Sequence, residues 1–208
     1  MKYDQEFEYI INSYKVNIGV MDGSNVIVLV IPGQNSGIYG YENRYLKLSK
    51  KLNKEYGATV IITSNPFQMD DPISDLMYVI NKYAERFNEY QLFYFGFSKG
   101  ANIGAQFATL VNKFSRLVLI NGPLMINYHK TKNGLQQFKG EKISFVYGCL
   151  DPSYKYVELI AYEPKENKEL VILENMNHNV EDEDVFLSLA DNTLFYDFTP
   201  KTASGVYK

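Results

Sequence analysis

Six short runs of apolar residues, separated by longer and more polar segments, constrain the fold of this 208-residue chain more than any other feature. The runs are rich in β-branched and aromatic residues and are nearly continuous, as expected of strands that are covered on both faces. Segments of helical character lie between and after them, at 41–56, 73–87, 99–114 and 182–189. Strands that alternate with helices predict βαβ units, right-handed crossovers and an α/β fold with a mainly parallel sheet. The predicted strands occupy 25–31, 58–64, 91–97, 116–122, 142–148 and 169–175.

The segments outside this alternation are short, so we interpret 1–208 as a single domain. Residues 1–23 are expected to add one or two antiparallel strands at an edge of the sheet. The polar segment 125–140 contains one turn signal, Asn133-Gly134, and is predicted to be a small insertion over one end of the sheet. The tail 199–208 has no clear apolar pattern and is expected to be mobile.

Composition excludes several classes of protein. The net charge of -3 argues against nucleic acid or an anionic membrane as the main partner. The single cysteine, Cys149, rules out an internal disulfide and suits a reducing compartment. No run approaches the ~18 apolar residues of a membrane-spanning helix, and the first ten residues lack the apolar core of a signal peptide. We therefore expect a cytoplasmic protein with no transmembrane segment and a small-molecule partner.

A serine lies in a tight turn where the third predicted strand meets the following helix, in the sequence Gly96-Phe97-Ser98-Lys99-Gly100. Ligands of open α/β sheets bind at the carboxyl ends of the strands, where Ser98 falls. A strand-to-helix turn that exposes a nucleophile requires small residues on both sides, and Gly96 and Gly100 meet this requirement. The helix N-terminus that follows favours negative charge on the serine. The alternative is a glycine-rich connection in which the serine only caps a helix.

A serine hydroxyl needs a base to become an effective nucleophile. The chain has two histidines, and His178 directly follows the last predicted strand, at the same end of the sheet as Ser98. It is the favoured base, although a loop histidine that caps the next helix is the alternative. His129 lies in the polar segment 125–140 and is interpreted as an exposed histidine.

An acid is needed to orient the imidazole and stabilise its cation. Asp151 follows the strand at 142–148 and is the favoured acid, with an ordinary Asp-Pro turn as the alternative. Glu174 and Asp182 are other candidates because they are close in sequence to His178. Asn121, at the end of the strand before, can serve only as a neutral hydrogen-bonding partner.

Acyl transfer also needs N–H donors for the oxyanion that develops in the reaction. The backbone N–H of Lys99, immediately after the serine, is the first candidate. The second is expected in the loop 32–37, after the first predicted strand, and the N–H of Gln34 is the favoured donor. A plain glycine-rich turn is the alternative for this loop.

These residues together resemble the α/β-hydrolase superfamily. The resemblance spans about 25–189 and depends on GFSKG with Ser98, GCLD with Asp151, the NH pair with His178, and IPGQ before the first crossover helix. It implies a three-layer α/β/α sandwich with Ser98 as nucleophile, His178 as base and Asp151 as acid. Lys99 and Gln34 would supply the oxyanion N–H groups. No metal and no organic cofactor is implied.

The sequence departs from the superfamily pattern at a few points. The loop after the first predicted strand begins Pro-Gly where many members have His-Gly, and Lys99 replaces a more usual apolar or Gln residue. The N-terminal part is short, so the first strands of a full eight-stranded sheet are expected to be missing or altered, and the cap is expected to be minimal. The implied activity is hydrolysis of an ester, thioester or amide. A non-catalytic binding protein on this fold and an acyltransferase with the same three residues are the alternatives.

Overall fold

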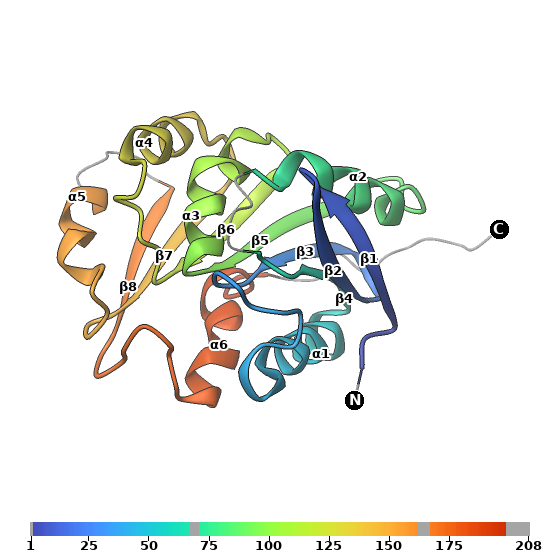
Figure 1. The fold of residues 1–208 in the computed structure, drawn as a ribbon, viewed down its shortest axis with the longest axis horizontal. Helices are drawn as coiled ribbons and strands as arrows, with labels where there is room; N and C mark the ends of the chain where they lie inside the picture. Colours follow the sequence, from blue (N-terminus) through green and yellow to red (C-terminus); the bar gives the residue numbers. More distant parts are fainter. Residues whose placement is uncertain (1, 67–70, 162–166, 199–208) are drawn as a thin grey trace.

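The computed structural model describes residues 2–66, 71–161 and 167–198, and the expectation for the tail 199–208 lies outside them. Its centre is one eight-stranded sheet with the order β1-β2-β4-β3-β5-β6-β7-β8 (Figure 1). The six strands predicted from apolar runs are β3 to β8, and they pair in parallel. The strands are β1 (Gln5–Ile11), β2 (Tyr14–Met21), β3 (Ser24–Ile31), β4 (Ala58–Thr63), β5 (Gln91–Phe97), β6 (Phe114–Ile120), β7 (Lys142–Gly148) and β8 (Lys168–Leu173).

The N-terminal residues form an antiparallel hairpin, β1 and β2, and β2 also pairs antiparallel with β4. The two turn residues, Asn12 and Ser13, have φ of 48° and 70°. Positive φ at both positions is typical of the type I′ turn that suits the twist of a two-residue hairpin. The expected edge strands are therefore confirmed. The expectation that strands are missing from the sheet is wrong, because the short N-terminal segment is long enough for two.

Helices cover both faces of the sheet, so the predicted three-layer α/β/α architecture is confirmed. Helices α1 and α6 lie together against one face, whereas α3 and α4 pack together against the other (Figure 1). The helices are α1 (Arg44–Tyr56), α2 (Ile73–Ala84), α3 (Lys99–Gln106), α4 (Tyr128–Gln137), α5 (Val157–Ala161) and α6 (Glu183–Thr193), with short 3₁₀ turns at Tyr41–Asn43, Ala108–Leu110 and Tyr154–Tyr156.

Two hydrophobic cores explain why the strand sequences are nearly continuous in apolar residues. In β3, Ile27 and Leu29 face the core under α2, α3 and α4, while the alternating residues Val28 and Val30 face the core under α1 and α6. Successive side chains of a strand point to opposite faces, so both sets must be apolar. The edge strand β8 differs, because its residues are only partly buried and Leu170 is exposed.

The segment 125–140 differs from its prediction. It contains α4, the crossover helix between the parallel strands β6 and β7, rather than an insertion over the end of the sheet. Asn133 and Gly134 lie inside this helix, so the predicted turn is wrong. A Cβ added to Gly134 would lie 2.1 Å from the carbonyl oxygen of Ala105 in α3. The glycine therefore permits close packing of two helices, and it does not mark a turn.

Among the residues described, no helix combines the length and the apolar character needed to cross a membrane.

Candidate active site

Ser98 occupies a strained turn between β5 and α3. Its φ of 52° and ψ of -115° are unfavourable for a residue with a side chain. Its backbone N–H donates to the carbonyl oxygen of Ile120, at 2.8 Å, at the end of the neighbouring strand β6. The side chain is thereby held at the carboxyl edge of the sheet, in front of the N-terminus of α3.

The two glycines beside Ser98 are required by close backbone contacts. A Cβ added to Gly100 would lie 1.9 Å from the carbonyl oxygen of Ile31, the last residue of β3. A Cβ added to Gly96 would lie 2.8 Å from the carbonyl group of Gly100. Any larger residue at either position would displace the turn that presents Ser98.

The structure brings Ser98, His178 and Asp151 together in one hydrogen-bonded series. Nε2 of His178 lies 2.9 Å from Oγ of Ser98, and Nδ1 of His178 is hydrogen-bonded to one carboxylate oxygen of Asp151. The other oxygen of Asp151 accepts from the backbone N–H of Ser153 at 2.6 Å. The side chain of Asp151 is fully buried, whereas 40% of the His178 side chain is exposed.

This geometry determines which ring nitrogen of His178 can act as a base. A carboxylate accepts hydrogen bonds, so Asp151 favours the tautomer with the proton on Nδ1. Nε2 then presents its lone pair to the hydroxyl of Ser98, which donates its proton toward it. The series can therefore transfer a proton from Ser98 to His178 while Asp151 stabilises the resulting imidazolium.

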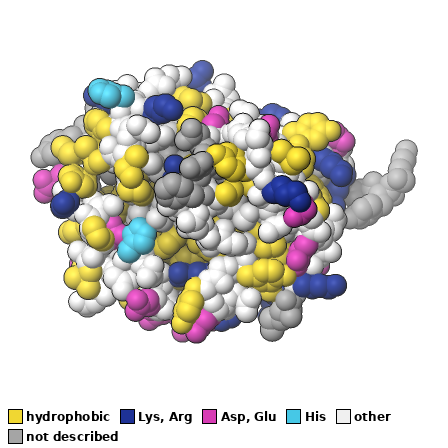
Figure 2. All heavy atoms as spheres, in the orientation of Figure 1, with side chains coloured by type: hydrophobic (Ala, Val, Ile, Leu, Met, Phe, Trp, Pro, Cys, Tyr) yellow, Lys and Arg dark blue, Asp and Glu magenta, His cyan; other side chains and the backbone are white. Residues whose placement is uncertain are grey.

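The other candidates for base and acid occupy different places. His129 is exposed on α4, and the two histidines are well separated on the face shown in Figure 2. Asp182 caps α6 by accepting from the N–H of Val185 at 3.0 Å, and Glu174 is exposed in the turn after β8. The carboxylate paired with His178 is that of Asp151.

The two candidate N–H donors for the oxyanion belong to two different segments that lie next to Ser98. Lys99 is the first residue of α3, so its N–H is among those left unpaired at a helix N-terminus. The loop after β3 also reaches the site, since a Cβ added to Gly33 would lie 3.5 Å from Cβ of Ser98. Within the described part of the chain, the N–H of Gln34 has no hydrogen-bond partner. Both N–H groups are therefore available, and their role remains a prediction.

Asn65 holds this loop in place and was not anticipated from the sequence. It is fully buried, and its Nδ2 donates to the carbonyl oxygen of Pro32 at 2.8 Å. Its backbone carbonyl accepts from Asn35 at 2.7 Å, and its N–H donates to the carbonyl of Ser36 at 3.0 Å. These contacts join residues about 30 positions apart in the chain, so no local pattern reveals them.

Two more residues that support the site, Asn121 and Arg44, contact the loop that carries His178. Asn121 was expected only as a neutral hydrogen-bonding partner, and it is fully buried with a φ of 47°. The position of Asn121 directly after a buried strand is a weak sequence signal for a role at the site. The sequence around Arg44 gives no such signal, because the residues that Arg44 contacts are 135 or more positions away in the chain. Burial lowers the pKa of Arg44, and its guanidinium lies 3.7 Å from the ring centroid of Phe186.

A cavity of about 580 Å³ lies beside the His178 loop. This volume is in the range of small-molecule sites. Its lining consists of Tyr41, Glu42, Arg44, Asn179, Glu181, Glu183 and Phe186.

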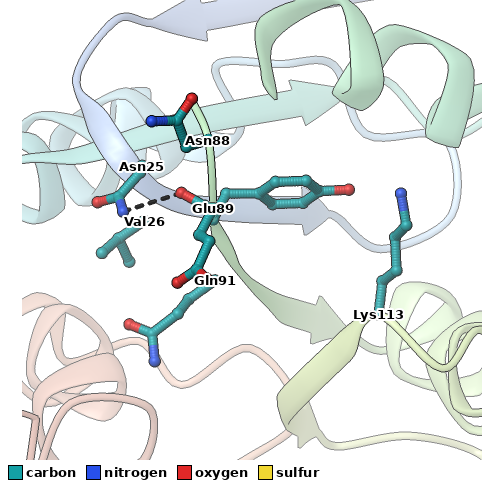
Figure 3. A pocket seen from close by; sticks show the side chains of 7 residues that line it. Asn25, Val26, Asn88, Glu89, Gln91 and Lys113 are labelled. Atoms are coloured by element: carbon teal, nitrogen blue, oxygen red, sulfur yellow. Dashed lines mark hydrogen bonds between the residues drawn. The ribbon is translucent and has the colours of Figure 1, made fainter. Parts of the chain in front are cut away.

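A second cavity, of about 450 Å³, lies at the opposite end of the sheet (Figure 3). Asn25, near the start of β3, lines it together with Gln91, the first residue of β5, and Lys113. Nδ2 of Asn25 donates to the carbonyl oxygen of Glu89 across its wall at 3.0 Å. This cavity is at the start of β5, whereas Ser98 follows the last residue of that strand, so the cavity is remote from Ser98, His178 and Asp151.

Across 2–66, 71–161 and 167–198, no cluster of three or more His, Cys, Asp or Glu side chains is arranged to hold a metal ion.

No protein-family model and no curated protein sequence matches this chain. Solved structures do match. The structure of Est1E from Butyrivibrio proteoclasticus has a TM-score of 0.71 at 12% identity, and the match covers 90% of this chain and 96% of that chain. An alpha-beta serine hydrolase homologue from Coxiella burnetii has a TM-score of 0.63 at 16% identity, covering 90% and 97%. Dienelactone hydrolase from Anabaena variabilis has a TM-score of 0.65 at 16% identity, covering 92% and 98%.

These similarities extend over nearly the whole length of both chains, at identities too low to transfer an activity. Together with the sheet order and the layers of helices, they establish the architecture. The chain has the α/β-hydrolase fold.

Proposed function

We propose that this protein is a serine hydrolase that cleaves an ester, thioester or amide of a small molecule through an acyl-enzyme. The observation that supports this most strongly is the Ser98–His178–Asp151 series on a strained turn. A strained serine beside a helix N-terminus, in contact with an imidazole that is itself oriented by a buried carboxylate, is the arrangement that nucleophilic catalysis requires. Structural neighbours named as hydrolases add support from the fold.

In the first half of the proposed reaction, Oγ of Ser98 forms a bond to the substrate carbonyl carbon while its proton moves to Nε2 of His178. The carbonyl π electrons move to oxygen, and the N–H groups of Lys99 and Gln34 stabilise the oxyanion. When the tetrahedral intermediate collapses, the bond to the leaving group breaks and His178 returns the proton to that group. The acyl group remains on Ser98.

In the second half, a water molecule replaces the leaving group. His178 takes a proton from the water as its oxygen bonds to the acyl carbon, and the same proton then returns to Oγ of Ser98 as the ester bond breaks. The products are a carboxylic acid and free enzyme. Asp151 keeps the imidazole oriented throughout and stabilises its cation in both halves.

A fluorophosphonate probe tests this proposal, because it reacts covalently with activated serines. We expect the wild type to be labelled on Ser98, as located by peptide mass spectrometry, and Ser98→Ala to be unlabelled. Asp151→Asn should slow labelling by roughly 10⁴-fold, since it favours the wrong tautomer of His178. Ser188→Ala is the matched control, because Ser188 lies on α6 and donates to Val185, and it should label as the wild type does.

A well-folded wild type that resists several such probes would contradict the proposal and favour a non-catalytic binding protein. Product analysis on a labile ester, with and without an added alcohol, separates hydrolysis from acyl transfer. Release of the free acid in the presence of the alcohol is the expected result.

A further inference from the structure

The loop that carries His178 is held by two side chains from outside it. We call residues 177–180 the His loop. Each of its four carbonyl oxygens accepts a hydrogen bond from a side-chain nitrogen. Asn121 donates to the first two, and Arg44 donates to the last two. The loop is therefore fixed from the sheet on one side and from α1 on the other.

Asn121 lies at the end of β6, the strand between β5, which leads to Ser98, and β7, which leads to Asp151. Its Nδ2 donates to the carbonyl oxygens of Asn177 at 3.2 Å and His178 at 2.8 Å. Its Oδ1 accepts from the N–H of Gly148, the last residue of β7, at 2.9 Å. One buried amide therefore joins the His loop to the strand that positions the acid.

Gly148 allows the chain before the His loop to pass this closely over β7. A Cβ added to Gly148 would lie 2.3 Å from the carbonyl oxygen of Met176 and 3.0 Å from that of Asn177. The approach of the two segments is therefore a direct backbone contact. Only a glycine fits at this end of β7 without moving the loop.

Arg44, the first residue of α1, holds the other half of the loop. Its NH1 donates to the carbonyl oxygen of Asn179 at 2.8 Å, and its NH2 donates to that of Val180 at 2.9 Å. The planar guanidinium suits two adjacent acceptors, a geometry that a lysine ammonium does not reproduce. The guanidinium also stacks over the ring of Phe186, with Cζ of Arg44 3.7 Å from the ring centroid.

The backbone of the His loop is strained at the end that accepts hydrogen bonds from Arg44. Val180 has a φ of 46°, which is a rare conformation for a β-branched residue, and it is fully buried. Strain of this kind persists only where the surroundings determine the conformation. The two hydrogen bonds from Arg44 and the burial of Val180 supply that constraint.

We infer that Asn121 and Arg44 are positioning residues, which together fix the His loop so that the His178 ring spans Ser98 and Asp151. The consequence for rate depends on the function proposed above, whereas the consequence for the His178–Asp151 hydrogen bond does not. A ring displaced by about 1 Å loses roughly 100-fold in rate. Neither residue touches the reacting atoms, so both act through His178.

The test uses two variants that remove the donors and leave the fold in place. In Asn121→Gly, the glycine tolerates the positive φ of this position. In Arg44→Met, the methionine keeps an apolar stem against Phe186, and position 44 is only half-buried, so the loss of the charge is tolerated. Asn53→Ala and Arg86→Met are matched controls. Asn53 also bridges two backbone carbonyls, and Arg86 also makes a two-pronged contact, with Asp22.

The first readout is the NMR signal of the imidazole N–H protons in histidine-labelled protein. The chain has two histidines, so His129→Gln identifies the signal of His178. A proton held between Nδ1 and the Asp151 carboxylate gives a strongly downfield resonance, which Asp151→Asn should abolish. We expect Asn121→Gly and Arg44→Met to shift or broaden this resonance while circular dichroism shows a folded chain.

The second readout is the kinetics of fluorophosphonate labelling. Both variants should lower the maximal labelling rate by roughly 10- to 100-fold with little change in the apparent affinity for the probe. Arg44→Lys should recover only part of the rate, and both controls should match the wild type. A folded Arg44→Met protein with the His178 resonance and the labelling rate of the wild type would overturn the inference. A wild type that is not labelled, but whose downfield resonance is lost in the variants, would leave the inference standing and overturn the proposed function.

Discussion

Ser98 shows how a single residue adopts a conformation that the local sequence does not favour. Its φ is positive although it carries a side chain, and the cost is of order 1–3 kcal/mol. The contact with Ile120 and the close packing of Gly100 against β3 hold it in place. The strain is therefore imposed by neighbouring strands, and relieving it should stabilise the protein.

We expect Ser98→Gly to be more stable than Ser98→Ala by about 1 kcal/mol, because only glycine adopts this backbone conformation without strain. Both variants lack the hydroxyl, so the difference reports the backbone alone. Urea unfolding measures it. At Lys54, an exposed helical position in α1, the order should reverse, and glycine should be less stable than alanine by about 1 kcal/mol. Equal stability of the two Ser98 variants would show that the turn is unstrained.

At the scale of elements, the site depends on how closely α3 approaches the sheet. Tyr94 in β5 donates its hydroxyl proton to the carbonyl oxygen of Gly100 at 2.7 Å, and Gly100 lies directly against the end of β3. The first turn of α3 is therefore in contact with both β5 and β3. The backbone at the N-terminus of this helix lies against the end of β3 because no side chain separates the two backbones.

Gly100→Ala should destabilise the protein by about 3 kcal/mol or more, because the new Cβ would overlap the carbonyl group of Ile31. Thermal or urea unfolding measures the loss of stability. The Gly100→Ala protein that remains folded should also react more slowly with a fluorophosphonate than the wild type does. Gly37→Ala is the control. A Cβ there meets no atom within 4 Å, so its stability should stay within about 0.5 kcal/mol of the wild type. A neutral Gly100→Ala would mean that α3 can move away from β3.

At the scale of the whole molecule, buried tyrosines replace tryptophan in the packing. The chain has 18 tyrosines and no tryptophan. Burial raises the pKa of Tyr45 to about 12, and it also raises the pKa values of Tyr3, Tyr94 and Tyr147 above the ordinary value of a phenol. Each of these phenols must stay neutral in the folded state. Both faces of the sheet contribute, since Tyr45 points from α1 into the core shared with α6, and Tyr147 faces the other core.

We therefore expect a steep loss of stability at alkaline pH. The folded-state pKa values are raised, so the stabilisation is complete below the unfolded tyrosine pKa of about 10 and declines as pH rises toward and beyond about 12. Free energies of unfolding in urea at several alkaline pH values measure this slope. Tyr147→Phe should reduce the slope, at a cost of about 1 kcal/mol at neutral pH for the lost bond to Gly122. A slope for Tyr147→Phe equal to that of the wild type would contradict this explanation.

Local patterns in the sequence were sufficient for most of the secondary structure and for naming the three residues of the candidate site. Nearly continuous apolar runs located β3 to β8, because strands buried on both faces, such as β3, need apolar residues on both sides. The positions of Ser98, Asp151 and His178 after strands pointed to one edge of the sheet, since parallel strands end together. Segment 125–140 was misread because Gly134 is needed for contact between helices, and a contact partner leaves no local signal.

The sequence by itself determined that strands and helices alternate, that a serine follows β5 in a turn between glycines, and that an aspartate and a histidine follow later strands. Only the tertiary structure decided how the histidine is held. Arg44 and Asn121 reach the His loop across 135 and 57 positions of the chain. Hydrogen bonds at such separations depend on strand order and on the approach of packed elements, whereas the periodicity of a sequence records only the burial of each residue's own segment.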